Sequence, residues 1–76
     1  MRARLRDVRD VEAAHFRAAA THDQAALLHQ EAAELFEMMG LRSLARSERA
    51  RARLDREDAA SEVDYAQLGR ERVSQP

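Results

Sequence analysis

Three histidines, His15, His22 and His29, recur every seven residues, and Phe36 takes the fourth position of the same row. Imidazole can bind a transition metal, gain a proton near neutral pH, or pack its flat ring between helices. Each role depends on what the histidines face, so the spacing by itself leaves all three interpretations open.

Metal binding requires several ligands around one ion. Histidines seven residues apart on a helix lie ~10.5 Å from one another, so one chain cannot place two of them on one ion. An antiparallel dimer can bring His22 to its symmetry mate. Glu12 and His15 have the Glu-x-x-His spacing of di-iron bundles, but it occurs once and the required carboxylate partner is not identifiable. The metal candidates are Glu12, His15, His22 and His29, but we favour packing and expect no cofactor.

The elements that must position these histidines are helices. No Pro or Gly interrupts the chain from about residue 5 to Met39, and strong helix formers dominate. Gly40 can adopt the left-handed conformation that ends a helix, and Ser43 is a candidate cap for the next helix. The pattern predicts an all-α hairpin domain over residues 1–68, with helices at about 5–39 and 42–67, and a flexible tail at 69–76.

Alanines repeat every seven residues in both expected helices. They are Ala18, Ala25 and Ala32 in the first, and Ala45, Ala52, Ala59 and Ala66 in the second. A heptad of small residues lets two backbones approach closely. An antiparallel fold about Gly40 would place His29 opposite Ala52 and His22 opposite Ala59, so that each ring fills the space beside a methyl group. A buried, neutral His22 would have a lowered pKa.

Part of the hairpin resembles a tetratricopeptide repeat. Residues 28–55 have that repeat's small residue, aromatic, turn glycine and two later alanines, which are Ala33, Phe36, Gly40, Ala45 and Ala52. The resemblance departs from the repeat at His29, at Arg49, and in the length of the first helix. It implies a helical hairpin that binds other proteins or a second copy of itself.

Apolar residues on two sides of the first helix predict further association. The candidate partner-binding residues are Phe16, Leu27, Leu28, Leu35 and Met38. A two-helix hairpin can cover one face of a helix but not two, so a dimer that forms a four-helix bundle is expected, or a partner protein that supplies the missing helices. The chain has 76 residues and no cysteine, so association is the available means of enlarging a small core.

Five arginines share one face of the second helix: Arg42, Arg46, Arg49, Arg53 and Arg56. Such a stripe can contact nucleic-acid phosphates. The net charge of −1 and the lack of interleaved aromatics argue against it. We interpret the arginines as solvated or as paired with Glu31, Glu34 and Glu37, and we expect no nucleic-acid partner.

The sequence contains no recognisable catalytic motif, so we expect a protein that is not an enzyme. Arginine and alanine are abundant and lysine is absent, which is typical of a high-GC bacterial genome. The lack of an export signal, a membrane span and cysteine predicts a cytoplasmic location. The favoured function is a homo-oligomerising interaction module. The alternatives are a small regulatory partner, such as an antitoxin, and a histidine-based metal-binding or pH-responsive bundle.

Overall fold

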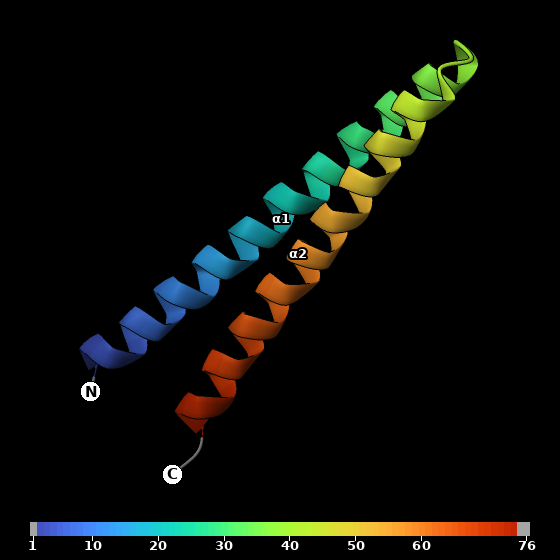
Figure 1. Cartoon of the computed structure of the whole chain (residues 1–76). Coiled ribbons are helices and arrows are strands. Elements are labelled where there is room, and N and C mark those ends of the chain that lie inside the picture. The colour runs from blue at the N-terminus through green and yellow to red at the C-terminus, as the bar shows by residue number, and fades with distance from the viewer. Residues whose placement is uncertain (1, 75–76) are drawn as a thin grey trace.

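The chain forms two long helices that pack against each other. The computed structural model describes the backbone of residues 2–74 and the side chains of residues 7–72. Helix α1 spans Arg2–Met38 and helix α2 spans Arg42–Ser74, and the described residues contain no strand. The helices are antiparallel, so both ends of the chain lie at the same end of a rod (Figure 1). The Cα atoms extend 58 × 16 × 10 Å.

The reversal at Gly40 agrees with the predicted turn. Gly40 has a φ of 76°, which places it in the left-handed region. Its N–H donates to Glu37 O at 3.0 Å, and the N–H of Leu41 donates to Phe36 O at 2.8 Å. This pair of hydrogen bonds is the Schellman motif, in which a left-handed glycine lets the last helical carbonyls be satisfied.

Helix α2 begins at Arg42, as predicted, but its cap residue and its C-terminal end differ from the prediction. Leu41 accepts the hydrogen bond from Ala45 N at 3.0 Å, so Leu41 occupies the cap position and Ser43 lies inside the helix. At the other end, α2 continues through Gly69 to Ser74, beyond the predicted end near residue 67. A single glycine costs a helix only about 1 kcal/mol relative to alanine, so the long flanking segments carry the helix across it. Residues 75 and 76 of the predicted tail lie outside the described residues.

Alanine is the only residue type that is fully buried among the described side chains. The buried residues are Ala19, Ala26 and Ala33 of α1 and Ala45, Ala52, Ala59 and Ala66 of α2. The α2 row is the predicted one, but the α1 row lies one residue later than predicted. Ala18, Ala25 and Ala32 are half-buried at the edge of the interface. The prediction erred because α1 carries both alanine rows side by side, and composition does not show which one faces α2.

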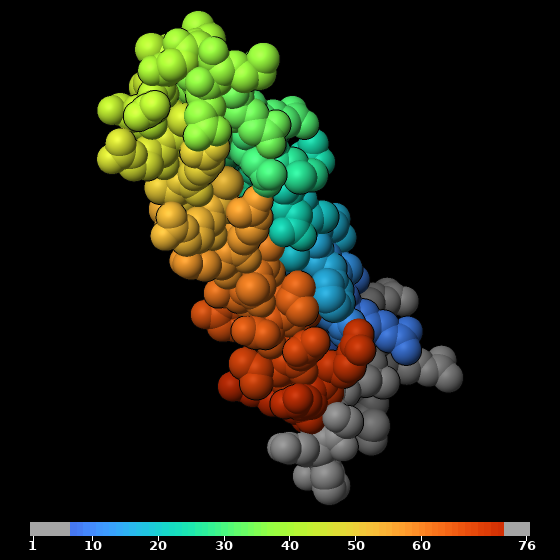
Figure 2. All heavy atoms as spheres, turned by 90° about the vertical axis from the view of Figure 1, so that its right-hand side faces the viewer, coloured from blue at the N-terminus to red at the C-terminus, as the bar shows by residue number. Residues whose placement is uncertain are grey.

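Heptad positions describe the whole interface. With the buried alanines assigned to position a, position d holds the histidines in α1 and the carboxylates Glu48, Asp55 and Glu62 in α2. The two helices therefore meet through alternating layers of methyl groups and polar side chains. Figure 2 shows the resulting narrow body, in which α1 lies alongside α2.

Candidate functional site

Each histidine of α1 is paired with a carboxylate of α2. His22 Nδ1 lies 3.1 Å from Asp55 Oδ1, and His29 Nδ1 lies 2.5 Å from Glu48 Oε2. His15 makes the same kind of contact with Glu62. We call these three pairs the histidine–carboxylate ladder. The residues in it are half-buried, so the pairs lie in the interface but remain open to water on one edge.

The ladder corrects the prediction that the histidines face alanines. The actual register places His22 beside Asp55 rather than opposite Ala59. The missed signal was in the sequence, because Glu48, Asp55 and Glu62 recur every seven residues just as the histidines do. Two polar rows with the same repeat satisfy each other's hydrogen bonds better than an imidazole beside a methyl group does. Val8 and Phe36 continue the histidine row of α1 at its two ends. The corresponding positions opposite them are Gly69 in α2 and Leu41 at its cap, so the carboxylate row does not extend to these levels.

Asp55 connects two steps of the ladder. Its second oxygen, Oδ2, lies 3.6 Å from His29 Nε2, while Oδ1 binds His22. The hydrogen bond that Asp55 accepts raises the pKa of His22 above its usual value, and the charges of Asp58, Asp55 and Glu62 add to the effect. The predicted lowering of the His22 pKa is therefore wrong. It assumed a neutral apolar site, whereas the actual neighbours are acids that stabilise the protonated ring.

The His22–Asp55 pair of the ladder forms a candidate metal site together with Asp58, which lies outside the ladder. Single ligand atoms of His22, Asp55 and Asp58 all lie within 4.8 Å of one another. Asp55 and Asp58 are one helical turn apart on α2, and His22 reaches them from α1. The other predicted metal candidates are placed differently. Glu12 binds Arg70, His15 binds Glu62, and His29 binds Glu48.

The ladder offers imidazole and carboxylate groups but no adjacent nucleophile. Among the described side chains, no serine or threonine hydroxyl hydrogen-bonds to a histidine. Thr21 Oγ1 donates instead to Arg17 O of its own helix at 3.0 Å. The carboxylates accept hydrogen bonds from the imidazole rings and so fix the orientation of the rings.

The arginine stripe lies along one broad face of the hairpin. Arg49 forms a bidentate ion pair with Glu37, in which Nη1 donates to Oε1 at 3.0 Å and Nη2 donates to Oε2. Arg56 Nη2 donates to Gln30 Oε1 at 2.5 Å. The nearby guanidinium lowers the pKa of Glu37, and the carboxylate raises that of Arg49. A hollow between the helices on this face is lined by Gln30, Glu34, Arg49, Ala52, Arg53 and Arg56. We call this side the charged broad face.

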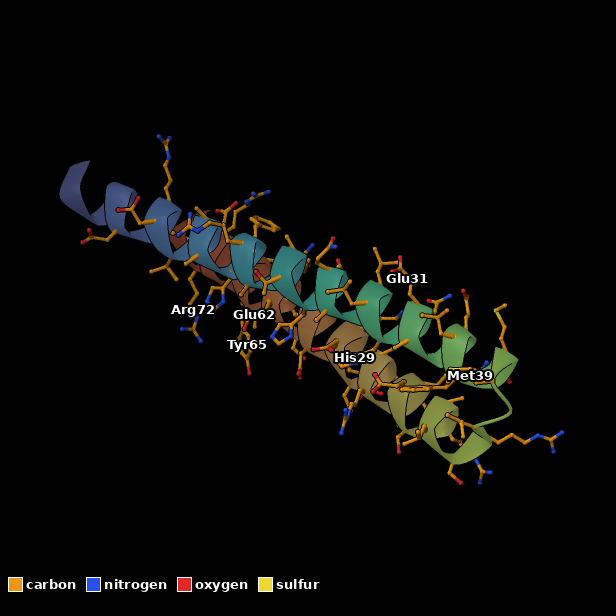
Figure 3. All side chains as sticks on the ribbon, turned by 90° about the horizontal axis from the view of Figure 1, so that it is seen from above. His29, Glu31, Met39, Glu62, Tyr65 and Arg72 are labelled. Carbon is orange, nitrogen blue, oxygen red and sulfur yellow. The ribbon has the colours of Figure 1, made fainter. Side chains whose placement is uncertain are left out.

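The opposite side is mostly apolar, and we call it the apolar broad face. It is formed by heptad positions g and c of both helices, which fall on the same side in an antiparallel pair. In α1 it consists of Val11, Ala14, Ala18, Thr21, Ala25, Leu28, Ala32, Leu35 and Met39. In α2 it consists of Leu44, Ser47, Arg51, Leu54, Asp58, Ser61, Tyr65, Leu68 and Arg72. Tyr65 projects to this side, away from the outer side of α1 where Glu31 lies (Figure 3).

The predicted partner-binding residues are exposed but are divided among three sides. Leu28 and Leu35 lie on the apolar broad face and are 57% and 60% exposed. Phe16 and Leu27 fall at heptad positions on the charged broad face, and Met38 lies on the outer edge of α1. The apolar broad face adds exposed residues that the sequence analysis did not select, among them Val11, Met39, Leu44, Leu54, Tyr65 and Leu68.

A hollow opens at the end of the hairpin where the two termini lie. It has a volume of about 210 Å³ and is lined by Asp7, Val8, Val11, Glu12, His15, Tyr65, Ala66 and Gly69. Gly69 occupies the ladder position where the preceding heptads have a carboxylate, and apart from the adjacent backbone of its own helix no atom lies within 4 Å of where its Cβ would be. The ring of Tyr65 stands 5.7 Å from that of His15 and forms one wall.

The chain matches no protein family, no curated protein and no solved structure. Its resemblance to a tetratricopeptide hairpin remains a prediction. In that repeat, about 34 residues supply both helices, whereas α1 alone has 37. Within the described residues, neither helix has a segment that is both long enough and apolar enough to cross a membrane.

Proposed function

We propose that the protein is a self-associating helical module whose apolar broad face binds a second copy of the chain. The observation that carries this proposal is the distribution of its apolar side chains. Every fully buried residue among those described is alanine, while twelve large apolar residues are exposed. Burying a methyl group contributes about 0.8 kcal/mol, and burying a Leu or Phe side chain contributes about 1.5–3 kcal/mol. The single hairpin therefore leaves exposed most of the apolar side chains whose burial would stabilise it.

The size of the apolar broad face fits a dimer interface. It lies on one of the sides spanned by the two longer extents, 58 and 16 Å. A standard interface buries about 800 Å² on each partner, which a surface of these dimensions can supply. The half-buried Ala18, Ala25 and Ala32 repeat the spacing of the buried alanines, so this side of α1 has the pattern of a second helix interface. Two hairpins joined in this way would form a four-helix bundle.

The proposal is tested by the mass in solution of three chains, measured by light scattering. Leu28→Glu places a charge on the apolar broad face, and Leu27→Glu places the same charge on the charged broad face. The two residues are 57% and 53% exposed, so they are closely matched. We expect the native chain and Leu27→Glu to have twice the 8.6 kDa mass of one chain, and Leu28→Glu to dissociate.

Two results would contradict this proposal. A folded native chain with the mass of a monomer at all concentrations would remove its basis. A dimer that Leu27→Glu disrupts and Leu28→Glu leaves intact would place the interface on the other face.

The cluster of His22, Asp55 and Asp58 supports a second candidate function, metal-dependent stabilisation. The three residues offer one nitrogen and two carboxylate oxygens, a donor set that suits Zn²⁺. Equimolar Zn²⁺ should then raise the melting temperature of the native chain. Asp58→Asn should abolish the rise and preserve the His22–Asp55 hydrogen bond, while the exposed Asp64→Asn should leave the rise unchanged. Equal responses of all three chains would exclude this site.

A further inference from the structure

We infer that the second copy binds antiparallel, across a two-fold axis that passes near Ala25 of α1 and Leu54 of α2. In this arrangement α1 lies on α1 of the second copy and α2 lies on α2. The inference rests on the proposed self-association and adds its orientation and register. Three separate features of the apolar broad face agree on it: the sizes of the α1 residues, the charges of α2, and the shapes of the two ends of the rod.

Residue sizes on α1 are complementary about Ala25. A two-fold axis at this level brings Ala25 to its own mate and Ala18 to Ala32. It also brings Leu28 to Thr21 and Leu35 to Ala14. Small residues meet at the centre, and each leucine meets a smaller side chain, which is the alternation that close helix packing requires.

Charges on α2 are complementary about Leu54. The polar groups of this face at positions g include Arg51 and Asp58, which are seven residues apart. An antiparallel pair centred at Leu54 places Arg51 beside Asp58 of the second copy, twice by symmetry. Arg51 contacts Glu48 of its own helix at 3.3 Å, but its side chain is 64% exposed and so can be redirected at little cost. Because His22 is paired with Asp55, Ala25 lies level with Ala52, and the α2 centre at Leu54 is about 3 Å further along its helix.

The two ends of the rod are also complementary. The turn end presents the exposed Met39 and Leu44, and the open end has the hollow walled by Val11 and Tyr65. The same two-fold axis brings Met39 to Val11 of the second copy and Leu44 to Tyr65. Apolar side chains that protrude at one end therefore meet an apolar hollow at the other, and each dimer contains two such contacts.

The parallel alternative fits the same residues less well. With a two-fold axis along the rod, α1 would lie on α2 of the second copy and the turn ends would meet. Arg51 and Asp58 would then face Ala25 and Ala18, and neither charge would gain a partner from the second copy. Covering a charge without a partner opposes association, so the antiparallel orientation is favoured.

Disulfide crosslinking tests this orientation cleanly, because the natural chain has no cysteine. Ala25→Cys should form a covalent dimer on mild oxidation, since the two copies of residue 25 meet at the axis. Ala18→Cys alone should not, because its two copies would lie about 21 Å apart along the helices. A mixture of Ala18→Cys and Ala32→Cys should crosslink as a heterodimer.

Charge exchange gives an independent readout that does not depend on cysteine. Arg51→Asp and Asp58→Arg should each raise the dimer dissociation constant by about tenfold, and the double variant should restore it. A dimer in which Ala25→Cys does not crosslink, or in which the double variant fails to restore affinity, would overturn the antiparallel register and leave self-association standing. A monomeric native chain would instead overturn the proposed function itself.

Discussion

His22 is the residue whose surroundings depart furthest from what its sequence neighbours suggest. The predicted register placed Ala59 opposite His22, which implied a neutral ring in an apolar interface. Its actual surroundings are supplied by α2, where Asp55 accepts its hydrogen bond and Asp58 and Glu62 add negative charge. The protonated imidazole is therefore the form that the hairpin stabilises.

This raised pKa gives stability a definite dependence on pH. The folded pKa lies above the unfolded value of ~6.5, so the contribution of His22 is complete below the unfolded value and is lost as pH rises through the folded one. We expect the melting temperature of the native chain to fall between about pH 6 and pH 8. His22→Gln should weaken this dependence, and an NMR titration should show the His22 pKa dropping in Asp55→Asn. A His22 pKa at or below the ordinary value would contradict the assignment.

The two glycines act in opposite ways at the scale of the helices. Gly40 has a positive φ that an L-residue adopts only with strain, whereas Gly69 is inside α2 with open space around its Cβ position. Gly40→Ala should lower the free energy of unfolding by about 1 kcal/mol, and Gly69→Ala should raise it by about 0.5–1 kcal/mol. Urea unfolding of the two variants checks both signs, and equal effects would mean that the turn geometry is not as described.

Close contact of the helices should make the alanine rows sensitive to added volume. Ala59 is 5% exposed, and the adjacent Ala60 is exposed. Ala59→Leu should destabilise the protein by about 1–3 kcal/mol through overpacking. Ala60→Leu adds the same atoms to the surface and should change stability little. Thermal unfolding of the pair distinguishes them, and a harmless Ala59→Leu would show that the helices are not held closely at that layer.

The sequence analysis predicted the elements but not the rotation of α1. The absence of Pro and Gly before Gly40, and the heptad of alanines in α2, predicted the hairpin, its turn and one buried row. The rotation of α1 was misassigned because two adjacent rows of alanines could each face α2. Either row would allow the helices to approach equally closely. The two rows are Ala18, Ala25 and Ala32, and Ala19, Ala26 and Ala33. The carboxylate row that selects between them lies on the other helix, so only the pairing of the two rows resolves it.

The whole molecule separates charge from apolar surface. One broad face carries most of the arginines with their acidic and amide partners, and the other carries mostly leucines, alanines and a tyrosine, with Arg51, Asp58 and Arg72 among them. The exposed ion pairs contribute little to stability, and the alanine core buries little area. We therefore propose that much of the hairpin's stability comes from a second copy of the chain that covers the apolar broad face.

The most direct test of this dependence is the melting temperature of the native chain over about two decades of protein concentration. If folding and association are coupled, mass action favours the folded dimer, and the melting temperature should rise steadily with concentration. Sedimentation of the same samples should give a mass twice that of one chain. A melting temperature that does not change with concentration, in samples that sediment as cooperatively folded monomers, would contradict the account.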